Sequence, residues 1–305
     1  MIKIGKKFVT YAQEFEDCIL FCVLNWIEKG FYVDVGANDP AILSVTKAFY
    51  DRGWNGINIE PLREEYSKLC RDRPRDINLN IGVGGENGEK EFAVLGASTT
   101  CDMDEILKLQ DEIGVLNKKI LPIRKLSDVL REYEDEHGKQ TIHFCKIDVE
   151  GSERDVLEGM NLEACRPWVM LLEAAFPGTH MPNHDRWEDL LVGNGYEYVF
   201  SYGINRYYVD TRLDRGTLLR LRDGFRDAEL CGKGEYDFVR QSNPDKILNG
   251  YMLLRFTRDF IKKIALGEIT FNEYITRRRA IKVFANIPLL KEIEWFGKFI
   301  LLRRD

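Results

Sequence analysis

The sequence predicts an α/β fold in which a mostly parallel sheet is covered by helices on both faces. Over residues 1–210, short strand-like runs alternate with segments whose apolar residues recur at helical spacing. The strand-like runs are largely apolar throughout, which is typical of parallel strands that are buried on both faces. The last two runs, at 196–201 and 206–209, are close enough to form a hairpin, which predicts an antiparallel strand at the sheet edge.

Turn and capping residues bound the individual elements. Ser44 can cap the helix that follows it, Gly53 lies just past that helix, and Pro61 stops the next strand. In chain order we expect helices over 10–27, 44–52, 62–70, 102–116, 126–133, 152–160 and 186–192. The expected strands cover 31–35, 56–60, 77–83, 92–95, 141–149 and 169–174, followed by the hairpin.

Composition and charge restrict the class of protein. Of 305 residues, 44% are hydrophobic and 31% charged, and the net charge of −6 gives no general attraction to nucleic acid. Residues 251–305 carry 12 Lys/Arg and 6 Asp/Glu, a balance of +6, so the preceding 250 residues carry −12. We therefore expect a catalytic domain over 1–210 and a basic, helical C-terminal extension over 211–305.

The seven cysteines have no regular spacing and include no CxxC pair, which argues against a disulfide framework or a structural zinc site. No apolar run near the start reaches the ~20 residues that span a bilayer. These features favour a cytoplasmic protein. The basic, aromatic-rich extension is explained either as a helical appendage with a solvated face or as a surface for the inner face of the membrane, a glycan carrier or a partner enzyme.

The stretch "FYVDVGANDP" indicates the cofactor. Ligands of open α/β sheets bind beyond the carboxyl ends of the strands, and this strand ends at Gly36. A dinucleotide site would need GxGxxG, whereas Asn38 and Ala41 stand at the other two glycine positions. S-adenosylmethionine instead requires one glycine and acids for its ammonium and ribose groups, which Asp34 and Glu60 can supply. The alternative is that both acids are ordinary strand-end residues.

Candidate catalytic residues follow the later strands. Alternation in "FCKIDVEG" places Lys146, Asp148 and Glu150 on one face of a strand, where they serve either catalysis or a structural ion pair. Glu173 ends the next strand, and His184 offers a base near neutral pH. Asp148, Glu150 and Glu173 could also ligate a divalent cation, because carboxylate oxygens suit such an ion.

Five ordered segments resemble the FkbM family of S-adenosylmethionine-dependent methyltransferases: "YAQEFEDCIL", "FYVDVGANDPAILSVTKAFYDRGWNGINIEP", "FCKIDVEGSERDVLEGM", "RPWVMLLEA" and "GINRYYV". The resemblance covers about residues 10–210 and implies a class I methyltransferase (Rossmann-like) fold and O-methylation, commonly of a sugar hydroxyl. The implied cofactor contacts are Gln13, Glu16, Asp17, Asp34, Gly36, Asn38, Ser44, Glu60, Pro61, Gly82 and Val83. The implied substrate contacts are Asn205 and Arg206, and His180 in the loop before His184 is a further candidate for substrate binding. Many relatives have a glycine where this chain has Asp39-Pro40.

The favoured interpretation is therefore an O-methyltransferase of a sugar or glycan in polysaccharide or glycolipid modification, with glycosyltransferases or an anionic membrane as further partners. Two alternatives remain. One is a non-catalytic scaffold of a polysaccharide-synthesis assembly, and the other is an O-methyltransferase of a small non-sugar metabolite. Arg206 has an alternative as well, because it can simply pair with an acid at the sheet edge.

Overall fold

The computed structural model describes residues 8–95, 98–102, 107, 117–177, 179–231 and 238–240. The chain divides into two compact units, Met1–Gln241 and Ser242–Asp305, and every described residue belongs to the first. The amphipathic basic segments expected after residue 250 lie outside the described residues, as does nearly all of the helix expected over 102–116.

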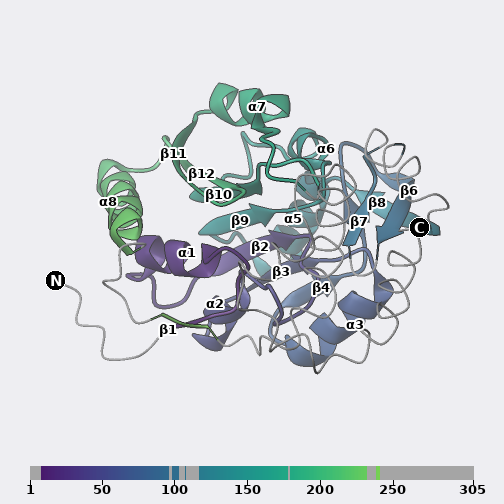
Figure 1. Ribbon diagram of the computed structural model, residues 1–305, viewed down its shortest axis with the longest axis horizontal. Helices are drawn as coiled ribbons and strands as arrows, with labels where there is room; N and C mark the ends of the chain where they lie inside the picture. Colours follow the sequence, from purple (N-terminus) through teal and green to yellow (C-terminus); the bar gives the residue numbers. More distant parts are fainter. Residues whose placement is uncertain are drawn as a thin grey trace, which may run out of the picture. The chain divides into compact units, whose positions relative to one another are not determined.

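A seven-stranded sheet forms the centre of the first unit, with the strand order β11-β12-β10-β9-β2-β3-β4 (Figure 1). All neighbouring strands are parallel except β12, which runs antiparallel to β10 and β11 and lies one strand in from the edge. The expected mostly parallel sheet is therefore confirmed. The strands are β2 (Phe31–Val35), β3 (Asn55–Ile59), β4 (Ile77–Leu79), β9 (Phe144–Ile147), β10 (Val169–Glu173), β11 (Tyr196–Tyr202) and β12 (Asn205–Asp210).

Helices cover both faces of this sheet, and each face has its own apolar core. One core joins α1 (Glu16–Leu24), α2 (Lys47–Asp51) and α8 (Arg215–Cys231) to the sheet through residues such as Leu20, Phe49 and Phe225. The other joins α5 (Leu126–His137), α6 (Glu153–Glu158) and α7 (Glu188–Gly193) to the opposite face. The remaining helices are α3 (Arg63–Asp72) and the short 3-10 helix η1 (His184–Arg186).

Two smaller sheets complete the described part of the chain. The first has the order β5-β8-β6-β7 and consists of β5 (Gly82–Val83), β8 (Asn117–Arg124), β6 (Gly88–Leu95) and β7 (Ser98–Thr100). The second pairs β1 (Phe8–Thr10) with β13 (Phe238–Arg240). Strand β8 was not expected from the sequence, and β6 is longer than the short strand expected there.

Two strands end earlier than the sequence predicts. The strand expected over 77–83 divides into β4 and β5, and β5 leaves the central sheet to pair with β8. The strand expected over 141–149 is reduced to β9, because the chain turns out of the sheet after Ile147. Residues 148–151 therefore form a turn, in which Glu150 has a φ of 52° and Gly151 a φ of 105°.

Helix α8 packs directly against α1, as Figure 1 also shows. Gly224 permits this contact, because a Cβ there would lie 2.5 Å from the Cα of Val23. Among the helices that the structure describes, none is long and apolar enough to cross a bilayer.

Candidate active site

The candidate site is a row of side chains across the carboxyl ends of four strands. By strand register, Glu60, Gly36, Asp148 and Glu173 are level with one another, and Asn205 of the antiparallel β12 stands opposite Glu173. Residues in register on neighbouring strands share one face of the sheet. Two strand-end acids and Asn205 thus lie on one side of Gly36, Glu60 lies on the other, and the glycine in between contributes no side chain.

Gly36 is required by the backbone that crosses it. Its φ is +78°, and a Cβ there would lie only 1.9 Å from the carbonyl oxygen of Asp148. The Asp148 amide donates to the carbonyl of Val35 at 3.1 Å, which holds the two chain segments together. From the sequence, this glycine is expected to permit the close approach of a cofactor. In the structure, the chain leaving β9 also approaches this position closely.

Lys146 connects the row of strand-end residues to Asp34 in β2. Its Nζ donates to the carbonyl of Gly36 at 2.7 Å and lies 3.4 Å from carboxylate oxygens of both Asp34 and Asp148. Burial alone would lower the pKa of Lys146, but Asp148 and Asp34 outweigh it and raise the pKa overall. Asp34 also accepts a 2.8 Å bond from the Thr46 hydroxyl. The ion pair considered for Lys146 therefore exists, and it includes Asp34.

Asp148, Glu150 and Glu173 come together as the sequence predicts, although by a different route for Glu150. Burial, followed by the nearby charges of Asp148 and Glu150 and a hydrogen bond with Asp148, raises the pKa of Glu173 well above its usual value. Each of these causes favours the protonated form of Glu173, and the hydrogen bond places its carboxyl group beside that of Asp148. Glu150 reaches this group from the turn after β9, and not from the strand itself.

Glu60 supports the loop that follows β2. Its carboxylate accepts from the backbone amides of Asn38 at 2.9 Å and Leu62 at 2.7 Å. Burial raises the pKa of Glu60 to about 7, although both amide bonds act in the opposite direction. Asn38 adopts a φ of 50°, a left-handed conformation that asparagine tolerates better than most residues. The loop and the acid at the end of β3 are therefore built as one unit.

Helix α1 covers the Asn205 end of the row. Glu16 accepts from the Asn205 side-chain amide at 2.9 Å, and burial raises the pKa of Glu16 to about 7. Asp17 serves the start of the helix, since its carboxylate accepts from the Thr10 hydroxyl and from three backbone amides, those of Tyr11, Ala12 and Cys18. These four bonds use the acceptor capacity of a carboxylate. Gln13 is half-buried in the segment that leads into the helix.

The other expected contacts are spread more widely. The N-cap residue of α2 is Thr46 and not Ser44, because the helix begins only at Lys47, and the Ser44 hydroxyl accepts from the Lys47 amide at 3.2 Å. Pro61 is buried directly after Glu60, whereas Gly82 and Val83 are buried in β5, where the missing Cβ of Gly82 makes room for the Phe92 ring.

The expected substrate residues do not form one group. Arg206 points away from Asn205, to the opposite face of the sheet, where it pairs with Glu188 at 2.8 Å and stacks on Tyr198. The alternative of a structural ion pair at Arg206 is therefore the one observed. His180 is exposed, and His184 is half-buried at the start of η1 with its Nδ1 lacking a hydrogen-bond partner among the described residues.

Glu153 was not singled out from the sequence, yet it fixes the turn that carries Asp148 and Glu150. One of its oxygens accepts from the amides of Val149 at 3.3 Å and Gly151 at 3.1 Å. The other oxygen is buried without a hydrogen-bond partner among the described residues, and burial raises the pKa of Glu153 to about 7. Its signal in the sequence is weak, because an acid in the first turn of a helix is common.

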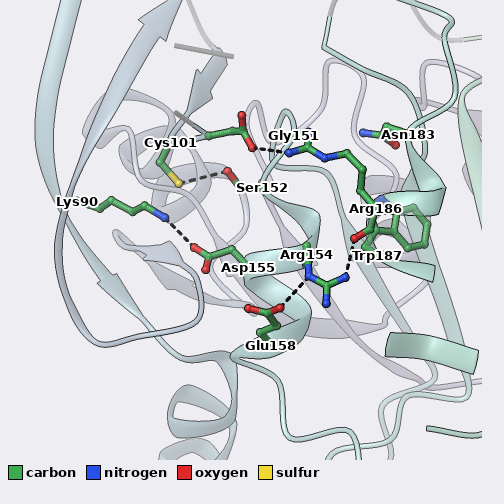
Figure 2. Close-up of a pocket in the computed structure, with 11 residues that line it drawn as sticks. Lys90, Cys101, Gly151, Ser152, Arg154, Asp155, Glu158, Asn183, Arg186 and Trp187 are labelled. Atoms are coloured by element: carbon green, nitrogen blue, oxygen red, sulfur yellow. Dashed lines mark hydrogen bonds and ion pairs between the residues drawn. The ribbon is translucent and has the colours of Figure 1, made fainter. Parts of the chain in front are cut away.

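A pocket of about 260 Å³ lies beside the same turn (Figure 2). Gly151 and Ser152 form part of its wall, so the turn that carries Asp148 and Glu150 borders the pocket. The charged side chains around it are paired, Lys90 with Asp155, Arg154 with Glu158, and Arg186 with Asp102. Cys101, Asn183 and Trp187 complete the lining. Positive and negative charges are equal in number there, so the pocket is polar without a net charge.

Among the residues that the structure describes, no group of three or more His, Cys, Asp or Glu side chains has an arrangement that could hold a metal ion. Asp148, Glu150 and Glu173 are among these residues. In the described conformation, the hydrogen bond between Asp148 and Glu173 and the ion pair of Asp148 with Lys146 already engage two of these three carboxyl groups.

Comparisons with known proteins agree with this arrangement. Residues 34–198, more than half of the chain, match the model of the methyltransferase FkbM domain. The matched region begins at Asp34 and contains Glu60, Asp148 and Glu173. Methyltransferase sdnD of Sordaria araneosa is 28% identical over 187 residues, which cover 53% of this chain and 71% of that protein. The sheet order, the strand-end acids and the family match together show that this chain belongs to the FkbM methyltransferase family.

Proposed function

We propose that this protein transfers a methyl group from S-adenosylmethionine to a hydroxyl of a sugar or glycan. The observation that carries the proposal is the row Glu60, Gly36, Asp148 and Glu173, because it places an acid at the end of β3 level with two carboxyl groups that hydrogen-bond to each other. Membership of a methyltransferase family gives the reaction class. The identities of the methyl donor and of the acceptor are tested by transfer of a labelled methyl group.

The residues around the first strand end fit S-adenosylmethionine better than a dinucleotide. The carbonyl oxygen of Asp148 fills the space where a Cβ of Gly36 would lie. The loop after Gly36 has neither of the further glycines that a pyrophosphate requires. Glu60 stands at the end of β3, where an acid can bind the ribose hydroxyls. Asn38 and the Glu16 end of α1 would hold the amino-acid part. When bound, this cofactor supplies an electrophilic methyl group.

Proton removal from the acceptor is assigned to Asp148. In this assignment Glu173 would hold a proton and donate a hydrogen bond to Asp148, while Lys146 lies 3.4 Å from the Asp148 carboxylate and would hold it in place. Asp148 is about two-fifths exposed, so an acceptor hydroxyl can reach it. Asp148 would accept the hydroxyl proton as the new carbon–oxygen bond forms and the methyl–sulfur bond breaks, with the electron pair of that bond staying on the sulfur of the departing thioether. General-base catalysis of this kind contributes about 10²–10⁴-fold to a rate.

The acceptor is assigned to the pocket beyond Gly151. Because its charged groups neutralise one another, the pocket favours a neutral ligand rich in hydroxyl groups over an anion or an apolar ring. The pocket would hold the non-reacting part of the acceptor, and the reacting hydroxyl would extend past the turn at 148–151 to reach Asp148. These features support a sugar over a small aromatic metabolite as the acceptor.

The test uses methyl-labelled S-adenosylmethionine with a panel of nucleotide sugars, oligosaccharides and phenolic metabolites, read by mass spectrometry. We expect label in at least one carbohydrate, and a loss of about 10²–10⁴-fold in the rate for Asp148→Asn with cofactor binding retained. Asp51→Asn is the matched control, since Asp51 is also paired with a lysine and its side chain is 40% exposed, against 39% for Asp148. Label only in the phenols would overturn the sugar assignment, and cofactor binding without any transfer would favour a scaffold.

A further inference from the structure

Arg73 lies behind the loop between β2 and α2, and its position suggests a role that the sequence did not indicate. It is the residue that follows α3, and its side chain is fully buried. A buried guanidinium is costly unless its donors are all engaged. The groups that accept hydrogen bonds from the guanidinium therefore indicate the structural role of Arg73.

The guanidinium joins the loop to the sheet. On the loop side it donates to the Pro40 carbonyl at 3.1 Å and to the Thr46 hydroxyl at 3.1 Å. On the sheet side it donates to the Tyr32 hydroxyl at 2.6 Å and to the Asp76 carboxylate at 3.0 Å. Pro40 lies near the start of the loop and Thr46 at its end, so one side chain holds both parts of the loop.

A second bond continues this connection into the candidate site. The Thr46 hydroxyl, which accepts from Arg73, donates to Asp34 at 2.8 Å. Asp34 in turn lies 3.4 Å from the Nζ of Lys146, which also contacts the row at Gly36. A change at Arg73 therefore reaches the strand-end row through a single hydroxyl group.

We propose that Arg73 is a positioning residue that holds the loop over residues 37–46 in the conformation that binds the cofactor. The proposal rests on the proposed function, because it takes this loop as part of the cofactor site. Arg73 itself does not face the row and touches no reacting group. Its planar, forked guanidinium can donate to Pro40 and Thr46 at once, which the single ammonium of a lysine cannot do while also reaching Asp76.

The test compares Arg73→Lys with Tyr32→Phe by calorimetric titration with S-adenosylmethionine. Lysine keeps a positive charge beside Asp76, which protects folding, but gives up at least one loop contact. Tyr32→Phe removes one partner of the same guanidinium without touching the loop. We expect Arg73→Lys to bind S-adenosylmethionine at least about tenfold more weakly, as is typical when residues that orient a binding site are lost. The affinity of Tyr32→Phe should be nearly unchanged.

Two further measurements keep the outcome clear. Thr46→Val, which removes the hydroxyl between Arg73 and Asp34, should weaken binding in the same direction and serves if Arg73→Lys does not fold. Amide hydrogen exchange over residues 37–46 should be faster in Arg73→Lys than in Tyr32→Phe, with or without a ligand. If the wild-type chain binds no S-adenosylmethionine, the proposed function fails while the exchange still tests Arg73. Equal affinities and equal loop exchange in both variants would overturn the role of Arg73.

Discussion

Replacing Gly36 by alanine tests how tightly the site is built. The new Cβ would lie 1.9 Å from the Asp148 carbonyl oxygen, and ordinary contact begins at 3.4 Å, so the backbone must move by about 3.4 − 1.9 = 1.5 Å. That movement strains the bond between Asp148 and Val35 and shifts the group that we assign as the base. Gly53→Ala is the matched control, because Gly53 has a φ of +93° and a Cβ added there would meet no atom within 4 Å.

The two variants separate backbone strain from steric overlap. A left-handed conformation costs an L-residue about 1–2 kcal/mol, which both variants share. Overlap should add about 1–3 kcal/mol in Gly36→Ala alone. Differential scanning calorimetry would therefore show a lower Tm for Gly36→Ala than for Gly53→Ala, by about 2–4 °C for each further kcal/mol in a unit of this size. A Gly36→Ala protein as stable as Gly53→Ala, with unchanged cofactor binding, would refute the crossing of Gly36 by Asp148.

Three more predictions follow from burial and charge. Folding raises the pKa of Glu153 from 4.5 to about 7, so the folded protein loses stability as pH rises between these values. In urea unfolding, Glu153→Gln should therefore increase the free energy of unfolding by up to about 3 kcal/mol at pH 8 and leave it unchanged at pH 4. An equal effect at both pH values would contradict this. Glu173→Gln mimics the protonated acid and should keep the rate of methyl transfer within about tenfold at neutral pH. The variant should also remain active at a higher pH than the wild type, in which Glu173 loses its proton once the pH exceeds its raised pKa. An activity profile that moves to lower pH would count against a proton held between Glu173 and Asp148. The protein should co-sediment with anionic vesicles at low salt and dissociate from them at high salt, because residues 251–305 carry a charge of +6. Absence of co-sedimentation with anionic vesicles at low salt would remove the membrane proposal.

The strand ends could be predicted from the sequence because their signals are local. Strand β2 covers Phe31–Val35 as expected, and the acids at the ends of apolar strands, Glu60, Asp148 and Glu173, lie level along one edge of the sheet because parallel strands end there. The polar face assigned to Lys146 and Asp148 is also confirmed by their 3.4 Å contact. Each of these predictions needs only the alternation of a strand and the place where it stops.

Features that depend on distant contacts were not predictable in the same way. Glu150 leaves the strand because the chain crosses Gly36, which lies 114 residues earlier. Arg73 stands in a run of charged residues, "RDRPRD", which is typical of a solvated surface, and only the fold shows that it is buried. Strand β8 is mostly exposed, contains Pro122 and depends on pairing with β6, so its own residues give a weak strand signal.

The bond between Glu16 and Asn205 spans 189 positions of the chain. It connects the helix over one end of the site to the last strand added to the central sheet in sequence order. A ribosome must therefore synthesise the chain past residue 205 before the first helix can gain this anchor. Fragments that end before β12 would retain the strand-end acids Glu60, Asp148 and Glu173 but would lack this anchor, so the region around α1 should be the last part of the crevice to become ordered during synthesis.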